Sequence, residues 1–161
     1  MEPIRIDIVP NNLGRVVFDV NVLTGDHKSF GSVRFKLDSG SDFTTVNCDD
    51  LYDLGYTREY LEKCPVHNIT ASTASEDTAL SLQYISNVSM KFDDRELQGC
   101  RIFFALDTKL RSLFGSDILK YFNWKVNYDA GVFQMAEVKT KPSLSEGETP
   151  IHIYSLEPPS V

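Results

Sequence analysis

The sequence is short of positive charge. Its 161 residues hold 16 lysines and arginines against 23 aspartates and glutamates, so the formal net charge is -7. Surfaces that bind nucleic acid are basic, and surfaces that bind anionic membranes carry clusters of lysine and arginine. No run of basic residues makes a local exception in this chain. We therefore expect neither nucleic acid nor a membrane among its partners.

Long apolar runs and paired cysteines are also missing. No run approaches the ~20 apolar residues of a membrane-spanning helix, and the first eight residues alternate apolar and charged side chains, unlike a signal peptide. The three cysteines, Cys48, Cys64 and Cys100, are widely spaced and form no CxxC pair. This pattern is typical of free thiols in a reducing compartment, so we predict a cytoplasmic protein. Nothing near the cysteines indicates the electropositive setting of a reactive thiol.

The sequence has few residues that bind metals. Its three histidines are scattered, and no group of His, Cys and Asp has the spacing of a ligand set. We therefore predict no metal site and no cofactor.

What the sequence does contain is a series of short alternating segments separated by turns. Helices are expected only at 47–54 and 57–63 and in a short turn that Ser116 or Asp117 would cap. Many short strands with little helix predict an all-β barrel or sandwich. The expected strands are 4–8, 16–23, 32–37, 66–73, 80–88, 89–92, 97–106, 124–128, 132–138 and 151–154.

The composition changes near the C-terminus. From residue 139 onward the chain is rich in Lys, Pro, Ser, Glu and Gly, and residues 141–150 contain no apolar residue except Leu144. Such a segment cannot bury enough apolar surface to fold by itself. We therefore divide the chain into a domain at 1–138 and a polar linker and tail at 139–161.

An acid follows one of the predicted strands. Asp38-Ser39-Gly40 comes directly after the strand at 32–37 and precedes a second apolar run. A strand that runs into a turn can hold an acid at the mouth of a cleft, although these three residues are also ordinary turn residues. About 75 residues later, Leu113-Phe114-Gly115 leads into the predicted helical turn.

Together these two stretches resemble the signature of retropepsin-like aspartic proteases. Asp38-Ser39-Gly40 is similar to the active-site motif, and Leu113-Phe114-Gly115 to the apolar-apolar-Gly element that braces the active loop. The resemblance spans residues 14–138. Ser116-Asp117 stands where viral members carry Arg-Asn, which favours a single-domain, non-viral, bacterial-type branch. The resemblance implies a closed all-β acid-protease-like barrel, a half-pepsin with one or two short helices, that acts as a C2 homodimer.

The resemblance implies an aspartic endopeptidase. In that chemistry one carboxylate takes a proton from the attacking water while the other gives a proton to the substrate carbonyl. The pair shares one proton because neighbouring like charges resist ionising together, an effect for which aspartic proteases are the usual example. Asp129-Ala130-Gly131 lacks the middle hydroxyl and is predicted to be a hairpin turn. The second acid would therefore be Asp38 of a second copy across a two-fold axis.

Each residue of the motif has an implied role. Asp38 would be the catalytic carboxylate, and the Ser39 hydroxyl would bond across the dimer axis. Gly40 would let the backbone approach the acid pair and the substrate. Ser41 is expected to donate to the carboxylate, which predicts an acid-leaning pH optimum. Asp42 would accept bonds from the substrate backbone or, equally, be a solvated turn acid.

The remaining expectations concern the flap, the termini and an alternative function. Members of the family close a glycine-containing flap over the substrate, and the best candidate in this chain has no glycine. The terminal strands at 4–8 and 151–154 are candidates for a dimer interface, and the tail could instead be disordered or block the cleft. The alternative is a non-catalytic retropepsin-like dimerisation or peptide-binding module, but an intact Asp-Ser-Gly favours catalysis. The residues expected to contact substrate are Gly40, Ser41, Asp42, Thr73, Ala74 and Ser75.

Overall fold

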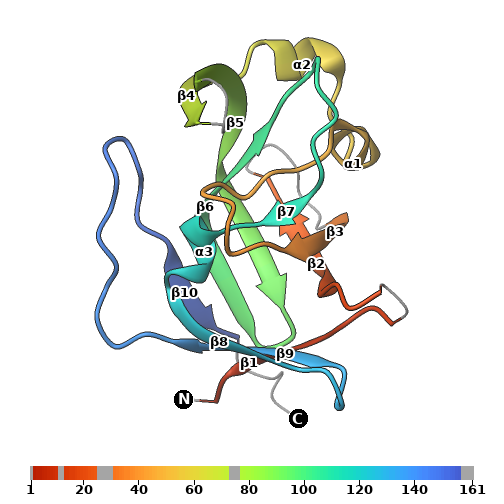
Figure 1. Cartoon of the computed structure of the whole chain (residues 1–161), viewed down its shortest axis with the longest axis vertical. Coiled ribbons are helices and arrows are strands. Elements are labelled where there is room, and N and C mark those ends of the chain that lie inside the picture. Colours follow the sequence, from red (N-terminus) through yellow and green to blue (C-terminus); the bar gives the residue numbers. More distant parts are fainter. Residues whose placement is uncertain (1, 11–12, 25–30, 73–76, 157–161) are drawn as a thin grey trace.

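In this computed structural model the chain is described at residues 2–10, 13–24, 31–72 and 77–156, with the side chains of 69–72 and 77–80 left out. These residues form ten strands and three short helices (Figure 1). The elements are β1 (Ile4–Asp7), β2 (Val17–Leu23), β3 (Gly31–Leu37), α1 (Cys48–Asp53), α2 (Arg58–Glu62), β4 (Val66–Ser72), β5 (Asp77–Phe92), β6 (Arg95–Phe104), β7 (Leu113–Phe114), α3 (Ser116–Leu119), β8 (Phe122–Asn127), β9 (Val132–Glu137) and β10 (His152–Ser155).

The strands form two sheets. A three-stranded sheet has the order β1-β9-β8, and a seven-stranded sheet has the order β10-β6-β5-β2-β3-β7, with β4 added beside β5. The larger sheet is strongly curled into a half-barrel, and the smaller sheet lies across one end of it (Figure 1). The expectation of a closed barrel is therefore corrected. Because β1 pairs with β9 instead of its neighbour β2, the described strands divide between two open sheets.

Alternation of side chains explains the strands that carry the site. Along β2 the side chains of Phe18, Val20 and Val22 are buried, while the polar residues between them are exposed. Strand β3 buries Val33 and Phe35 in the same way and pairs antiparallel with β2. A period of two places one face of each strand against the core, so both predicted strands are confirmed.

Four phenylalanines form the centre of the core. The Phe18 ring lies 5.2 Å from Phe114 edge to face and 5.3 Å from Phe133 in a stacked arrangement. The Phe35 ring lies 5.8 Å from Phe114. All four side chains are fully buried, and each such ring pair adds about 0.5–1.5 kcal/mol beyond the area it buries. Phe114 therefore anchors β7 in the core.

The two-residue strand β7 connects separate parts of the chain. It pairs parallel with the end of β3, where Leu37 is opposite Phe114. On its other side, Leu113 forms an antiparallel bridge with Thr45, which also bridges to Phe103 of β6. The chain therefore passes β7 twice, once before and once after the turn that contains Asp38.

The described residues form three helices, as the sequence pattern predicts, and one more than the one or two that the resemblance implied. Asn47 caps α1 by accepting the Asp49 amide at 2.8 Å, and the predicted cap of α2, Thr57, accepts the Tyr60 amide at 3.2 Å. The third helix, α3, has Gly115 at its cap position and no side-chain cap. The predicted capping by Ser116 or Asp117 is therefore wrong, since both residues lie inside the helix.

The C-terminal segment is held against the domain, although its composition predicts a linker. The Lys120 ammonium donates to the Ser143 carbonyl at 3.2 Å and pairs with the Glu148 carboxylate. The Ile151 amide donates to the Tyr121 hydroxyl at 3.1 Å. Both terminal strands pair within the chain, β1 with β9 and β10 with β6, and each lies at the edge of its sheet. In the described part of the chain no helix is long and apolar enough to cross a membrane.

Candidate active site

Asp38 lies in a tight turn at the end of β3. Its amide donates to the Phe114 carbonyl at 3.0 Å, and its own carbonyl accepts the Ser41 amide at 3.1 Å. The Gly40 amide donates to the Asp38 carboxylate at 3.0 Å, so the side chain is oriented by the turn that it begins. Asp38 is half-buried, whereas Ser39 and Gly40 are exposed. The turn therefore presents a fixed carboxylate at the protein surface.

The predicted bracing residues lie against this turn. Leu113 exchanges backbone hydrogen bonds of 3.0 Å with Thr45 in both directions. The Ser116 amide donates to the Ser41 carbonyl at 2.8 Å. At Gly115 an added Cβ would lie 2.6 Å from the Phe43 carbonyl oxygen and 2.8 Å from that of Ser41. Only a residue without a side chain allows this close approach, which accounts for the glycine at this position.

Sequence reasoning named Asp117 as a helix cap and missed its contact with Thr44. Its Oδ2 accepts the Thr44 amide at 3.0 Å, while Oδ1 accepts the Thr44 hydroxyl at 2.7 Å and the Ile118 amide at 3.0 Å. The Thr44 hydroxyl in turn accepts the Gly115 amide at 3.1 Å. Burial raises the pKa of Asp117 above its usual value, bonds from Thr44 and Ile118 act to lower it, and the charge of Glu148 raises it. Asp117 thus ties α3 to the segment that follows the Asp38 turn.

Of the two polar residues after the motif, Ser41 differs from expectation, and Asp42 agrees with its expectation as a solvated turn acid. The Ser41 hydroxyl donates to the Phe43 carbonyl at 2.7 Å. The expected bond from Ser41 to the Asp38 carboxylate is therefore wrong in this structure, because the turn directs the hydroxyl to a backbone acceptor. The acid-leaning pH optimum that depended on this bond loses its support. Asp42 is exposed and forms no hydrogen bond or ion pair within the described residues.

The candidate flap is the hairpin of β4 and β5. The two strands pair from Val66 and Gln83 to Ser72 and Asp77. The predicted flap residues Thr73, Ala74 and Ser75 lie between these strands, outside the described residues. Two strands were expected at 80–88 and 89–92, but β5 is a single strand of 16 residues, and its register against β6 shifts between Ile85 and Met90.

Aromatic side chains join the Asp38 turn to this hairpin, and sequence reasoning missed them as well. Phe43 follows the turn, His67 lies on β4, and Phe103 lies on β6, yet their rings are in mutual contact. These residues are at least 24 positions apart, so no local pattern could have indicated the cluster.

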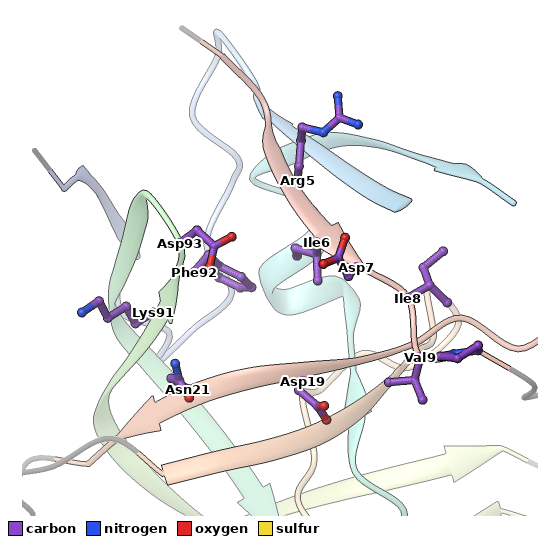
Figure 2. A pocket seen from close by; sticks show the side chains of 11 residues that line it. Arg5, Ile6, Asp7, Ile8, Val9, Asp19, Asn21, Lys91, Phe92 and Asp93 are labelled. Atoms are coloured by element: carbon purple, nitrogen blue, oxygen red, sulfur yellow. The ribbon is translucent and has the colours of Figure 1, made fainter. Parts of the chain in front are cut away.

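A separate cavity of about 600 Å³ opens between β1, β2 and the end of β5 (Figure 2). Its lining mixes acids with bases, namely Asp7, Asp19 and Asp93 with Arg5 and Lys91. No residue of the Asp38 turn or the bracing element lines it, and its mixed charge favours no class of ligand. Among the described residues, no group of three or more His, Cys, Asp or Glu side chains could hold a metal ion.

The chain has the fold of a known group of enzymes. It matches the crystal structure of a retropepsin-like aspartic protease from Rickettsia conorii with a TM-score of 0.57. The match covers 96% of this chain and 93% of the Rickettsia chain, at 17% sequence identity. No protein-family model and no curated protein matches the sequence. At this identity the likeness concerns the fold, and it agrees with the retropepsin-like fold that the two sequence motifs predicted.

Proposed function

We propose that the protein is an aspartic endopeptidase that hydrolyses peptide bonds with two Asp38 carboxylates, one from each subunit of a homodimer. The observation that carries the proposal is the Asp38 turn. A retropepsin-like fold holds an Asp-Ser-Gly at the end of β3, bonded through the Asp38 amide to the bracing residue Phe114. Catalytic groups need this kind of fixed placement by rigid elements.

The chemistry requires two acids with different protonation. The ionised carboxylate takes a proton from water as the water oxygen bonds to the substrate carbonyl carbon, and the protonated one donates to the carbonyl oxygen. The carboxyl that took the proton from water then gives it to the leaving nitrogen, the other carboxylate takes a proton back from a hydroxyl of the tetrahedral intermediate, and the carbon–nitrogen bond breaks. Asp129-Ala130-Gly131 lies in the turn between β8 and β9, as predicted. A second copy of Asp38 is therefore the proposed partner, and the exposure of Ser39 and Gly40 leaves the turn open to it.

A non-catalytic dimerisation or peptide-binding module on the same fold is the second candidate. It would use the same turn without proton transfer. The intact Asp38-Ser39-Gly40 favours the enzyme, since a binding module has no need of an acid held in this way.

The cysteines support the choice of an acid rather than a thiol as the catalytic group. Burial raises the pKa of the Cys48 and Cys100 thiols, whereas a reactive cysteine has a lowered pKa. The three cysteines form no disulfide with one another, which also suits the proposed cytoplasmic location. The proposed partners are a second copy and a peptide or protein substrate, with no nucleic acid, membrane or cofactor.

The decisive experiment combines cleavage of a fluorogenic peptide library with analytical ultracentrifugation. Cleavage is measured at acid and neutral pH, with and without pepstatin. The Asp38→Asn variant should lose cleavage by at least a thousandfold and keep the same sedimentation, because its amide cannot act as the base. The Asp129→Asn variant, in the turn between β8 and β9, should behave as the unmodified protein.

Three other results would contradict the proposed enzyme. Cleavage that survives in Asp38→Asn would show that the acid pair is wrongly assigned. A strict monomer without cleavage would overturn the proposal. A dimer that binds peptides from the library but cleaves none of them would establish the binding module.

A further inference from the structure

Three rings meet where the Asp38 turn approaches the β4–β5 hairpin. The Phe43 ring lies 4.6 Å from Phe103 and 5.4 Å from His67, and His67 lies 5.8 Å from Phe103. These distances are within the range of favourable aromatic pairs. The three residues come from the active turn, from β4 and from β6, so the cluster joins three separate parts of the fold.

Phe103 is the fixed member of the cluster. Its side chain is fully buried. Its amide donates to the Thr44 carbonyl at 2.9 Å, and its carbonyl accepts the Val46 amide at 2.8 Å. Further support comes from the Tyr84 ring at 5.5 Å and from the Arg101 guanidinium at 5.2 Å from the ring centre. These contacts fix the position of the Phe103 ring, so the ring is a rigid surface against which a residue of the hairpin can pack.

His67 is the residue of β4 that packs against the Phe103 ring. Strand β4 pairs with β5 alone among the described strands. The hairpin base is held by the Gln83 side chain, which donates to the carbonyls of Leu61, Glu62 and Cys64. Within the described residues, the ring contact between β4 and residues 38–43 is that of His67 with Phe43. The hairpin base is thus held both to the segment after α2 and to the Asp38 turn.

His67 lies near the base of the β4–β5 hairpin. A change in its contact with Phe43 would therefore tilt the rest of β4 about that point. Ser72, at the end of β4, is five positions after His67, a length of roughly 17 Å in a strand. A tilt of about 3.5° at the base would therefore move Ser72 by about 1 Å, the scale on which misplacement can cost about a hundredfold in rate. The displacement caused by the loss of one ring contact at the base would therefore increase along the strand toward Ser72.

We propose that His67 is a positioning residue whose imidazole, seated against Phe43 and Phe103, sets the angle between the β4–β5 hairpin and the turn that carries Asp38. This inference deepens the proposed function and rests on it. His67 acts through the hairpin, without touching the reacting atoms. An aromatic ring is needed at this position, and the imidazole nitrogens are not.

The test compares three variants of the full-length protein. His67→Ala removes the ring, His67→Phe keeps a ring, and Tyr128→Ala removes an exposed ring in the turn between β8 and β9 as a control. Cleavage is measured with one peptide that the unmodified protein cleaves, and kcat is expressed per folded molecule from circular dichroism. We expect His67→Ala to raise KM about tenfold, His67→Phe to restore it, and Tyr128→Ala to leave it unchanged. An unchanged KM in His67→Ala, with kcat lowered only by loss of folded protein, would overturn the inference.

A second measurement separates failure of this inference from failure of the proposed function. Amide hydrogen exchange needs no substrate, so it is followed in the Asp38→Asn background across β4 and residues 77–83. We expect His67→Ala to speed exchange there about tenfold, and His67→Phe and Tyr128→Ala to leave it unchanged. Equal exchange in all variants would overturn the positioning role even in an active enzyme. Faster exchange in a protein that cleaves nothing would support the contact and overturn only the proposed function.

Discussion

The brace between Asp117 and Thr44 can be tested by a change of one group. Thr44→Val replaces the hydroxyl by a methyl of similar size, so the packing is kept. Thr44 is fully buried, and its hydroxyl donates to Asp117 Oδ1 at 2.7 Å while accepting the Gly115 amide at 3.1 Å. The Thr44 amide keeps its own bond to Asp117 Oδ2. The substitution thus removes two hydrogen bonds and leaves the backbone in place.

The size of the effect follows from those two bonds. A hydrogen bond to a charged group contributes about 1.5–3 kcal/mol, and a buried amide without a partner costs about 1–3 kcal/mol. Because the two losses share one atom and are not additive, we expect Thr44→Val to lower the free energy of unfolding by about 2–4 kcal/mol. For a domain of this length that is a fall of roughly 5–15 °C in Tm. The loss is large beside the about 5–15 kcal/mol of total stability of a typical domain.

The effect should also depend on pH. Burial raises the pKa of Asp117 above its ordinary value of 3.8, and the Thr44 hydroxyl is one of the groups that lower it. A carboxyl with a raised folded pKa holds its proton more tightly in the folded state, so its contribution to stability is lost as pH rises through that pKa. Without the hydroxyl the folded pKa rises further and the loss grows. The destabilisation by Thr44→Val should therefore be larger at pH 7 than at pH 3.

Urea unfolding followed by circular dichroism at pH 3 and pH 7 measures both effects. Thr108→Val is the matched control, because Thr108 is exposed and surface substitutions usually change stability by less than about 0.5 kcal/mol. If Thr44→Val matched this control at both pH values, the brace would contribute nothing. An equal loss at the two pH values would show that the hydroxyl does not act on an ionised Asp117.

Two further predictions concern the same region. Gly115→Ala should lower the free energy of unfolding by about 1–3 kcal/mol through overpacking, because the new Cβ would lie 2.6 Å from the Phe43 carbonyl oxygen. Peptide cleavage should fall by more than the loss of folded protein accounts for. Cleavage equal to that of the unmodified protein would contradict this. Lys120→Met should cost about 2–3 kcal/mol in thermal unfolding, since it leaves the Glu148 carboxylate, 12% exposed, without its ion partner. The double variant with Glu148→Leu should recover most of that loss, and a further loss would argue against the pair.

Local sequence patterns predicted the strands and turns that depend on neighbouring residues. The alternation in β2 and β3 was sufficient to place Asp38 at a strand end, and the turn at Asp129-Ala130-Gly131 follows from its composition. The hydrogen bond of Thr57 at the start of α2 also joins residues three positions apart. In each case the physical cause lies within one element or one turn, so it is visible in the sequence.

Contacts between distant residues could not be predicted in this way. Asp117 stands in the first turn of α3, where an acid favours the helix dipole and is a plausible cap. Its actual partner, Thr44, is 73 residues away, and nothing near either residue indicates the other. The same holds for the ion pair of Lys120 with Glu148, which fixes a segment whose composition predicts a linker.

The Ser41 hydroxyl shows a different limit. Sequence correctly placed a donor three residues after Asp38, but the choice between two acceptors depends on the geometry of the turn. With the Asp38 carboxylate already bonded to the Gly40 amide, the hydroxyl bonds to the Phe43 carbonyl. A motif thus fixes which groups are present, whereas the backbone decides which of them meet.

The bonds that shape the Asp38 turn have a consequence for the proposed dimer. In the described residues the Asp38 amide is held by Phe114, its carboxylate by Gly40, and the far side of the turn by Ser116. All three partners belong to the same chain, so the turn is formed before a second copy arrives. On the proposed function, dimerisation therefore supplies a second carboxylate to a turn that already has its shape. Because two adjacent carboxylates resist ionising together, the proton shared between two such rigid turns, rather than a rearrangement of either, is what would make them one catalytic site.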